Sequence, residues 1–174
     1  MKKRSIFLMT VAAILSAAAC GYRTTPGTGM APAEVRILYV DRFVNTTDQP
    51  YLENYLKNAF VDQIVSGRRF SLAPNGASAD ALLSGKVLSL RSAHASLDGA
   101  NVAQEDRLYL SVEVSLRKRS DGSLLWSLGE LAENRTYRIH RDDYRSTGLN
   151  RDQALKLLAR DLAEKAYRNL MTGF

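Results

Sequence analysis

The stretch that decides the fold is LYLSVEVSLR, residues 108–117, in which an aliphatic residue stands at every second position. Successive side chains of a β-strand point to opposite faces, so this pattern predicts a strand with one buried face and one face in water. Asp121-Gly122, which follows, is a dipeptide typical of tight hairpin turns. Leu124, Trp126 and Leu128 then continue the alternation. The segment therefore predicts an antiparallel hairpin in a sheet that is covered on one side.

Two further strands and two helices are predicted around this hairpin. The two strands are predicted over residues 34–40 and 80–91, which are rich in apolar and β-branched residues. A polar tip at residues 97–101 separates the second of these strands from the hairpin. Apolar residues recur at helical spacing over 52–64, and Gly67 is expected to end this helix as the residue just past it. A second helix is predicted to begin at Asn150, an N-cap residue with Gln153 three positions on. The expected fold class is α+β, a two-layer sandwich with two helices on one face of a four-stranded, mixed and mostly antiparallel sheet, in the order β-α-β-β-β-α.

Composition is that of an ordinary globular protein and excludes several kinds of function. The 174 residues are 45% hydrophobic and 24% charged, which suits a single domain. One cysteine and two histidines allow neither an intrachain disulfide nor a cysteine-built zinc site. Lys2, Lys3 and Arg4 account for three of the 24 basic residues, so the chain from Cys20 onward carries 21 bases against 18 acids. This mild net charge of +3 argues against nucleic acid as a partner.

The first 33 residues are predicted to direct and anchor the protein. Basic residues 2–4, an apolar run over 6–15 and small residues before Cys20 form the pattern of a secretory signal. The run is shorter than the roughly 20 apolar residues that span a bilayer. Because a cysteine follows the small residues, the segment resembles a bacterial lipoprotein signal, in which that cysteine becomes the first mature residue and is acylated. We therefore predict a signal peptide over 1–19, a lipidated flexible tether over 20–33 and a single domain over 34–174.

Two neighbours of the cysteine bear on this prediction. Ala17 stands where lipoprotein signals usually carry Leu, and the alternative is an ordinary signal peptide that is cut near Ala19 and leaves an incidental cysteine. Gly21, rather than Asp, follows the cysteine, which by resemblance to sorting in enteric bacteria favours the outer over the inner membrane. Two or more acyl chains anchor a protein stably. The expected location is the periplasmic face of the outer membrane, with the protein held by the lipid on Cys20.

No catalytic pattern is found in the sequence. Nucleophile-elbow, zinc-protease and phosphate-loop motifs are all absent from it. Asp142 and Asp143 are adjacent, and neighbouring residues of an extended segment point to opposite sides, so they make a poor acid–base pair. His140 is interpreted as a surface residue. We therefore expect no enzyme, no catalytic residue, no metal site and no cofactor.

Four short segments occur in an order that is shared with a known family. They are CGYR (20–23), VDRFVNTT (40–47), ADALLSGKV (79–87) and DGSLLW (121–126). The ordered set resembles the LptE family of lipopolysaccharide-assembly lipoproteins. The resemblance implies two helices packed on a four-stranded sheet and no enzymatic activity. It also implies a plug inside the outer-membrane barrel LptD, which the protein helps to assemble, and contact with lipopolysaccharide on its way to the cell surface.

A second family shares part of this pattern. The stretch FVNTT (43–47), followed by a helix and later by an Ala-Asp-Ala strand, is also similar to periplasmic lipoprotein domains of the CsgG and LpoB kind. Those domains serve curli secretion and activation of a peptidoglycan synthase. The Gly-Tyr-Arg start, the single compact domain and the long last helix favour the LptE family.

The best candidate contact for lipopolysaccharide is a basic and aromatic stretch before the last helix. Arginine binds phosphate well because its planar fork can make two parallel charge-assisted hydrogen bonds. The candidate residues are Arg138, Arg141, Arg145, Tyr137 and Tyr144. The alternative is that these residues form a solvated, partly self-paired connection. The polar tip at 97–101 carries Asp98 and no base, so no phosphate contact is assigned to it.

Overall fold

The computed structural model describes residues 34–97 and 103–172. The predicted signal peptide, the tether with Cys20 and residues 98–101 of the polar tip lie outside the described residues. The predicted boundaries of these segments stay predictions.

Three long antiparallel strands form the body of the sheet. They are β4 (Ala81–Leu97), β5 (Ala103–Lys118) and β6 (Leu124–Arg138). The alternating stretch 108–117 lies within β5 and pairs with β4 on one side and β6 on the other. The predicted turn is present between β5 and β6, where Gly122 has φ 72° and the Asp121 carboxylate accepts a 2.9 Å hydrogen bond from the Ser123 amide.

Three short strands extend the sheet, which within the described residues has six strands instead of the four expected. They are β1 (Ile37–Val40), β2 (Val44–Asn45) and β3 (Ser71–Leu72). All three pair in parallel, β1 with β3 and β4, and β2 with β4. Strands of two residues carry no periodicity, so β2 and β3 could not be predicted from the sequence. The mixed sheet and the α+β class agree with the prediction.

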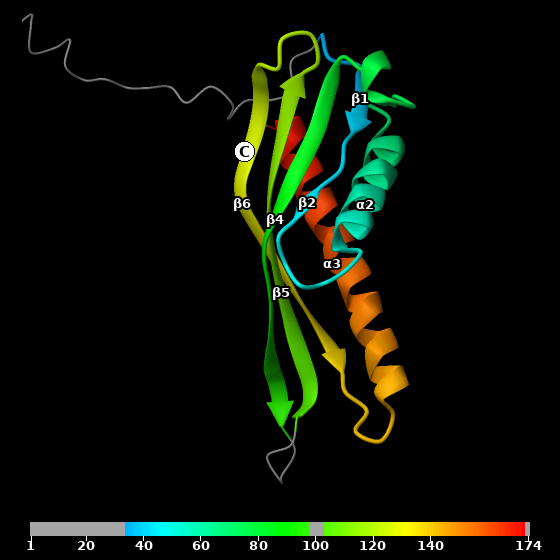
Figure 1. Cartoon of the computed structure of the whole chain (residues 1–174), viewed down its shortest axis with the longest axis vertical. Helices are drawn as coiled ribbons and strands as arrows, with labels where there is room; N and C mark the ends of the chain where they lie inside the picture. The colour runs from blue at the N-terminus through cyan, green and yellow to red at the C-terminus, as the bar shows by residue number, and fades with distance from the viewer. Residues whose placement is uncertain (1–33, 98–102, 173–174) are drawn as a thin grey trace, which may run out of the picture.

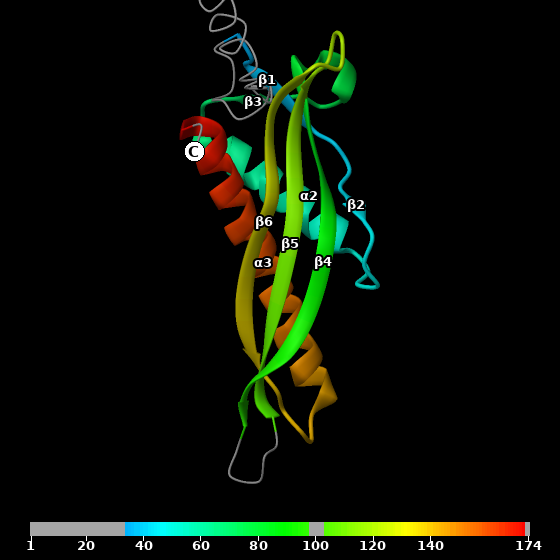
Figure 2. The ribbon, with the colours of Figure 1, turned by 90° about the vertical axis from the view of Figure 1, so that its left-hand side faces the viewer.

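Both long helices pack on the same face of the sheet. They are α2 (Leu52–Gly67) and α3 (Tyr144–Thr172), and a short 3-10 helix, η1 (Gly76–Ser78), precedes β4. Figure 1 shows the two helices on one side of the long strands, and Figure 2 looks onto the opposite, uncovered face. The fold is therefore the two-layer sandwich that the alternating pattern predicted.

The core lies between the sheet and the helices. The five aliphatic side chains of the β5 alternation are each at most 1% exposed, which confirms the predicted buried face. From the helix side they meet Leu56, Phe60 and Ile64 of α2 and a stripe of Leu and Ala on α3. Trp126 is also buried, and its indole nitrogen donates a 3.2 Å hydrogen bond to Asn169 of α3.

Two of the family-like segments meet inside this core. The ring of Phe43 lies over Gly85 of β4, where a Cβ atom would come within 2.3 Å of the ring and 2.7 Å of the Glu113 carbonyl oxygen. Phe43 also packs on Phe60, with ring centroids 5.1 Å apart. Glycine at position 85 thus allows the segment between β1 and α2 to lie directly on the sheet.

The end of α2 differs from the prediction. Gly67 belongs to the helix, and Arg68 after it adopts the left-handed conformation, with φ 55°. A Cβ atom on Gly67 would lie 2.2 Å from the hydroxyl oxygen of Tyr167 and 2.4 Å from its Cζ atom. Glycine is therefore required by the close approach of α3, not by a left-handed backbone at this residue.

The start of α3 also differs, because the helix begins at Tyr144 and Asn150 lies inside it. The Asp143 carboxylate accepts a 3.0 Å hydrogen bond from the Ser146 amide. Aspartate is a good N-cap because its side chain satisfies amides that the first helical turn leaves free. The Asn150 side chain instead donates a 3.0 Å hydrogen bond to the Arg138 carbonyl, which ties α3 to the end of β6.

Candidate functional site

The described residues offer no cluster of metal ligands. Across residues 34–97 and 103–172, no three or more His, Cys, Asp or Glu side chains gather where they could hold a metal ion. In the same part of the chain, no helix has both the length and the apolar character needed to cross a membrane. The residues that the sequence predicts as contacts for lipopolysaccharide lie towards one end of the molecule.

Four of the five predicted contact residues meet at this end. Arg138 is the last residue of β6, Arg141 lies in the connection to α3, and Tyr144 and Arg145 begin α3. We call this region, residues 138–145, the distal turn; it lies at the lower end of Figure 1. All four side chains are exposed, and that of Tyr144 is 87% exposed. The distal turn thus presents arginine beside exposed aromatic surface.

Local hydrogen bonds give the distal turn a defined shape. The amide and the carbonyl oxygen of His140 bond the Thr147 hydroxyl at 2.8 Å and 3.0 Å. The Ser146 hydroxyl and amide hold the pKa of the Asp143 carboxyl below its usual value, so this cap stays ionised at neutral pH. Tyr144 and Arg145 therefore stand on a capped first turn, whose amides add partial positive charge.

Tyr137, the fifth predicted residue, belongs to a different environment. It is half-buried and its hydroxyl donates a 3.3 Å hydrogen bond to Asp106 of β5. The other oxygen of Asp106 lies 2.6 Å from Nδ1 of His94 on β4. Burial and the nearby Asp106 raise the pKa of Tyr137 above its usual value. Tyr137 thus links the ends of three strands, while its four companions face solvent.

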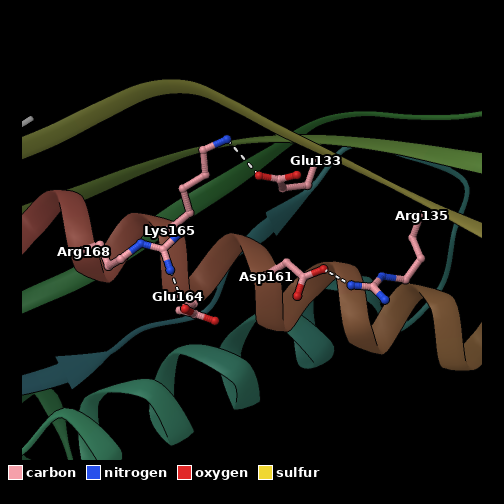
Figure 3. A network of polar contacts seen from close by, with 6 residues as sticks. All are labelled: Glu133, Arg135, Asp161, Glu164, Lys165 and Arg168. Atoms are coloured by element: carbon pink, nitrogen blue, oxygen red, sulfur yellow. Dashed lines mark hydrogen bonds and ion pairs between the residues drawn. The ribbon is translucent and has the colours of Figure 1, made fainter.

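Ion pairs fasten β6 to α3 and so position the distal turn. Lys165 of α3 lies 2.8 Å from Glu133 of β6, and Arg135 of β6 pairs with Asp161 of α3 (Figure 3). Glu164 and Arg168 pair along the helix in the same region. Partly exposed pairs of this kind contribute only about 0–1 kcal/mol each. These pairs mainly fix the position of β6 relative to α3. The guanidinium of Arg135 is occupied by its ion pair with Asp161.

Three arginines share the uncovered face of the sheet near the distal turn, and sequence reasoning missed two of them. Arg91 of β4 stands opposite Tyr109 of β5, and Arg138 of β6 stands opposite Glu105. Arg107, two residues before Tyr109 and therefore on the same face, donates a 3.2 Å hydrogen bond to the Thr136 hydroxyl. Tyr109 is 38% exposed among these side chains. The alternation in β5 predicts that Arg107 and Tyr109 lie on the uncovered face. Which residues of β4 and β6 stand beside them is set by the register of the strands.

A shallow depression lies between the end of β6 and the first turns of α3. Its volume is about 380 Å³, and its lining includes Tyr137, Arg138, His140, Asn150 and Leu157. Both arginine and aliphatic residues thus contribute to its lining. The described part of the chain starts near β1, at the opposite end of the molecule from the distal turn (Figure 2).

Comparison with known proteins shows where the same fold occurs. Similar solved structures include the PelC dodecamer of Paraburkholderia phytofirmans, at 22% identity and a TM-score of 0.54, covering 83% of this chain and 95% of that one. A lipoprotein of Caulobacter crescentus matches at 19% identity and a TM-score of 0.54, covering 75% and 86% of the two chains. Uncharacterized lipoprotein B of Nitrosomonas europaea matches at 13% identity and a TM-score of 0.53, covering 85% and 88%. At these identities the likeness concerns the fold alone.

The sequence itself gives the family. A search of curated proteins finds no significant match. The family model described as "LptE: Lipopolysaccharide-assembly" matches residues 35–171, which is almost the whole described chain. The resemblance noted from the four short segments is thereby confirmed. The chain belongs to the LptE lipopolysaccharide-assembly family.

Proposed function

We propose that this protein is an outer-membrane lipoprotein, anchored at the periplasmic face by acylated Cys20, that assists assembly of an LptD-like barrel and plugs it. We further propose that its distal turn contacts lipopolysaccharide during transport to the cell surface. The LptE family is a non-enzymatic family of assembly lipoproteins, and its model spans residues 35–171. The partner barrel and the lipid contact follow from that membership as proposals for this chain.

The observation that carries the lipid contact is the grouping of arginines beside exposed aromatic and aliphatic surface at one end. Lipid A presents phosphates next to acyl chains, so a surface that handles it needs cationic and apolar groups side by side. The distal turn offers Arg138 and Arg145 with Tyr144, and Leu149, one turn into α3, is 62% exposed. Arg91 and Arg107 extend the positive surface across the open face of the sheet.

Reversal of two of these charges tests the proposed contact. Charge-assisted hydrogen bonds contribute about 1.5–3 kcal/mol each when they are desolvated, and much less when they stay exposed. We therefore expect Arg138→Glu with Arg141→Glu to weaken binding at least about tenfold, since tenfold corresponds to about 1.4 kcal/mol. The measurement is a titration of Cys20→Ser protein with purified lipopolysaccharide, accompanied by circular dichroism and a thermal melt.

Arg160→Glu is the matched control for that titration. Arg160 is an exposed arginine of α3 that lines the groove between the two helices, away from the distal turn. The control should bind lipopolysaccharide like the parent, although it changes the net charge in the same direction. Equal affinities of the parent and the folded double variant would place the lipid contact elsewhere or show that there is none.

Depletion of the protein tests the proposed partner. If the domain assists and plugs an LptD-like barrel, depletion should lower the amount of correctly assembled barrel and raise sensitivity to large hydrophobic antibiotics. Co-purification of the lipidated protein from detergent-solubilised outer membranes should recover the barrel. Normal barrel levels and an intact permeability barrier after depletion would contradict the assignment. Recovery of a peptidoglycan synthase or a secretion ring instead would favour a CsgG- or LpoB-like role.

A further inference from the structure

The lower half of β4 is a free strand edge. On one side β1 and β2 pair with β4 only as far as Val87, whereas β5 pairs with its other side along nearly its whole length. The register with β5 shifts at Leu88 and again at Ala95. Between these two irregularities, residues 89–94 pair regularly with β5 and, within the described residues, with no other strand. We call residues 89–94 the free edge.

The outward main-chain groups of the free edge can be identified from the hydrogen bonds above it. The carbonyl of Val87 accepts a 2.8 Å hydrogen bond from the Thr46 hydroxyl, so the main-chain groups of Val87 face away from β5. The extra residue at Leu88 reverses the alternation along the strand. In an antiparallel pair the main-chain groups of every second residue face outward. Beyond the irregularity, the outward groups are those of Leu90, Ser92 and His94.

The other edge of the sheet is protected in ways that the free edge is not. Charged side chains and irregular pairing keep edge strands from pairing with other chains. On β6, Glu133 and Arg135 reach to ion-pair partners on α3 (Figure 3), and the register with β5 shifts at residues 129–130. The free edge reads Ser-Leu-Arg-Ser-Ala-His, with neither Pro nor Lys. Its register irregularities lie at its two ends, and its one arginine, Arg91, points to the uncovered face, so the outward main-chain groups between them form a short, regular template for another strand.

The side chains along the free edge indicate what kind of strand would fit. On the uncovered face, Arg91 has no ion-pair partner among the described residues, and Arg107 lies on the neighbouring strand. On the helix side, Leu90 packs partly buried against the core. A depression of about 370 Å³ opens at the upper end of the free edge, between it, the loop at residues 47–49 and Arg151. Acidic side chains would suit the first face, and apolar ones the second.

We propose that the free edge of β4 is a docking site on which an extended segment of a protein partner adds as a further strand. Main-chain hydrogen bonds provide the attachment in such strand addition, and side chains at alternate positions provide the selectivity. The segment alternates acidic residues, which lie over Arg91, with apolar residues, which lie beside Leu90. This interface shares Arg91 with the surface that extends the proposed lipopolysaccharide contact, but its main-chain attachment along residues 89–94 does not depend on that contact.

A synthetic peptide of four Glu-Val repeats, labelled with fluorescein, tests the proposal by fluorescence anisotropy on the full lipidated protein in detergent. We expect saturable binding that is at least tenfold weaker for Ser92→Pro, because proline removes an outward amide without breaking the pairing with β5. The matched control is Asn134→Pro on β6. The Ile139 amide donates a 2.9 Å hydrogen bond to the Gln104 carbonyl of β5. Main-chain groups of odd-numbered residues in this part of β6 therefore face β5, and the amide of Asn134 faces outward on the other edge of the sheet. This control should bind the peptide like the parent.

Changes in the peptide test the same interface without altering the protein fold. Methylation of every peptide nitrogen should abolish binding, because it removes the donors on both edges of the peptide strand. A Lys-Val peptide should bind at least tenfold more weakly than Glu-Val. No saturable binding, equal losses in the Ser92→Pro and Asn134→Pro variants, or full binding of the methylated or the Lys-Val peptide would overturn the proposal. Sedimentation velocity measures whether the protein self-associates. A dimer of the parent that is absent from the Ser92→Pro variant would show that a second copy occupies the free edge, and this result would also overturn the proposal.

Discussion

Gly67→Ala is expected to destabilise the domain, although alanine is ordinarily the better helix former. A Cβ atom at this position would overlap the end of the Tyr167 ring, 2.2 Å from its hydroxyl oxygen and 2.4 Å from Cζ. The ring cannot easily move aside, because its edge packs against Phe70, with centroids 6.3 Å apart at 89°. The Tyr167 hydroxyl is buried near the Arg69 main chain without reaching hydrogen-bond geometry, and burial raises its pKa.

The size of the effect follows from two opposing contributions. Overpacking of a well-filled contact costs about 1–3 kcal/mol, and replacement of glycine inside a helix by alanine contributes up to about 1 kcal/mol of stability. We expect a net loss of about 1–2 kcal/mol, which lowers the melting temperature by about 3–8 °C for a domain of this size. The assay is urea unfolding and a thermal melt, both followed by circular dichroism.

Gly148→Ala is the matched control, since Gly148 also lies in a helix but a Cβ atom there would meet nothing within 4 Å. This change should stabilise the protein by about 0.5–1 kcal/mol. Tyr167→Leu in the Gly67→Ala background should recover part of the loss, so that the two changes are not additive. If Gly67→Ala raises the melting temperature as Gly148→Ala does, the close contact between α2 and α3 is refuted.

Three further predictions concern the other end of the domain, the sheet and the anchor. Asp80 accepts hydrogen bonds from the amides of Arg36 and Ile37 at 3.0 and 2.9 Å, which hold its pKa below the usual value. Asp80→Asn should therefore lower the melting temperature at pH 7. The difference from the parent should be smaller at pH 3, because the parent loses the stability that the Asp80 carboxylate contributes as pH falls through its lowered pKa. An equal difference in melting temperature at both pH values would contradict this. Gly85→Ala should lower the melting temperature more than Gly67→Ala, since it would meet both a buried ring and a carbonyl oxygen; a smaller effect would mean that the ring has room to move. Cys20→Ser should release the protein from the membrane fraction into the periplasm, and unchanged fractionation would show that Cys20 is not the anchor.

The sequence by itself determined the elements whose signals are local. The alternation over 108–117 gave β5 and its buried face, and Asp121-Gly122 gave the turn into β6. Such patterns can be predicted because each depends on neighbouring residues and on the fixed side-chain period of a strand or helix. The ordered short segments also indicated the family that the match over residues 35–171 shows.

Tertiary structure decided the features that depend on contacts between distant segments. Gly67 was misinterpreted because its partner, Tyr167, lies one hundred residues away in the sequence. The shared face of Arg91, Arg107 and Arg138 depends on the register of three strands, including the shifts within them, and no local pattern encodes a register. The same pairing turned Tyr137 towards Asp106 and away from the other predicted contact residues. Residues of suitable chemistry could thus be named from the sequence, but their common surface is set by how the strands align.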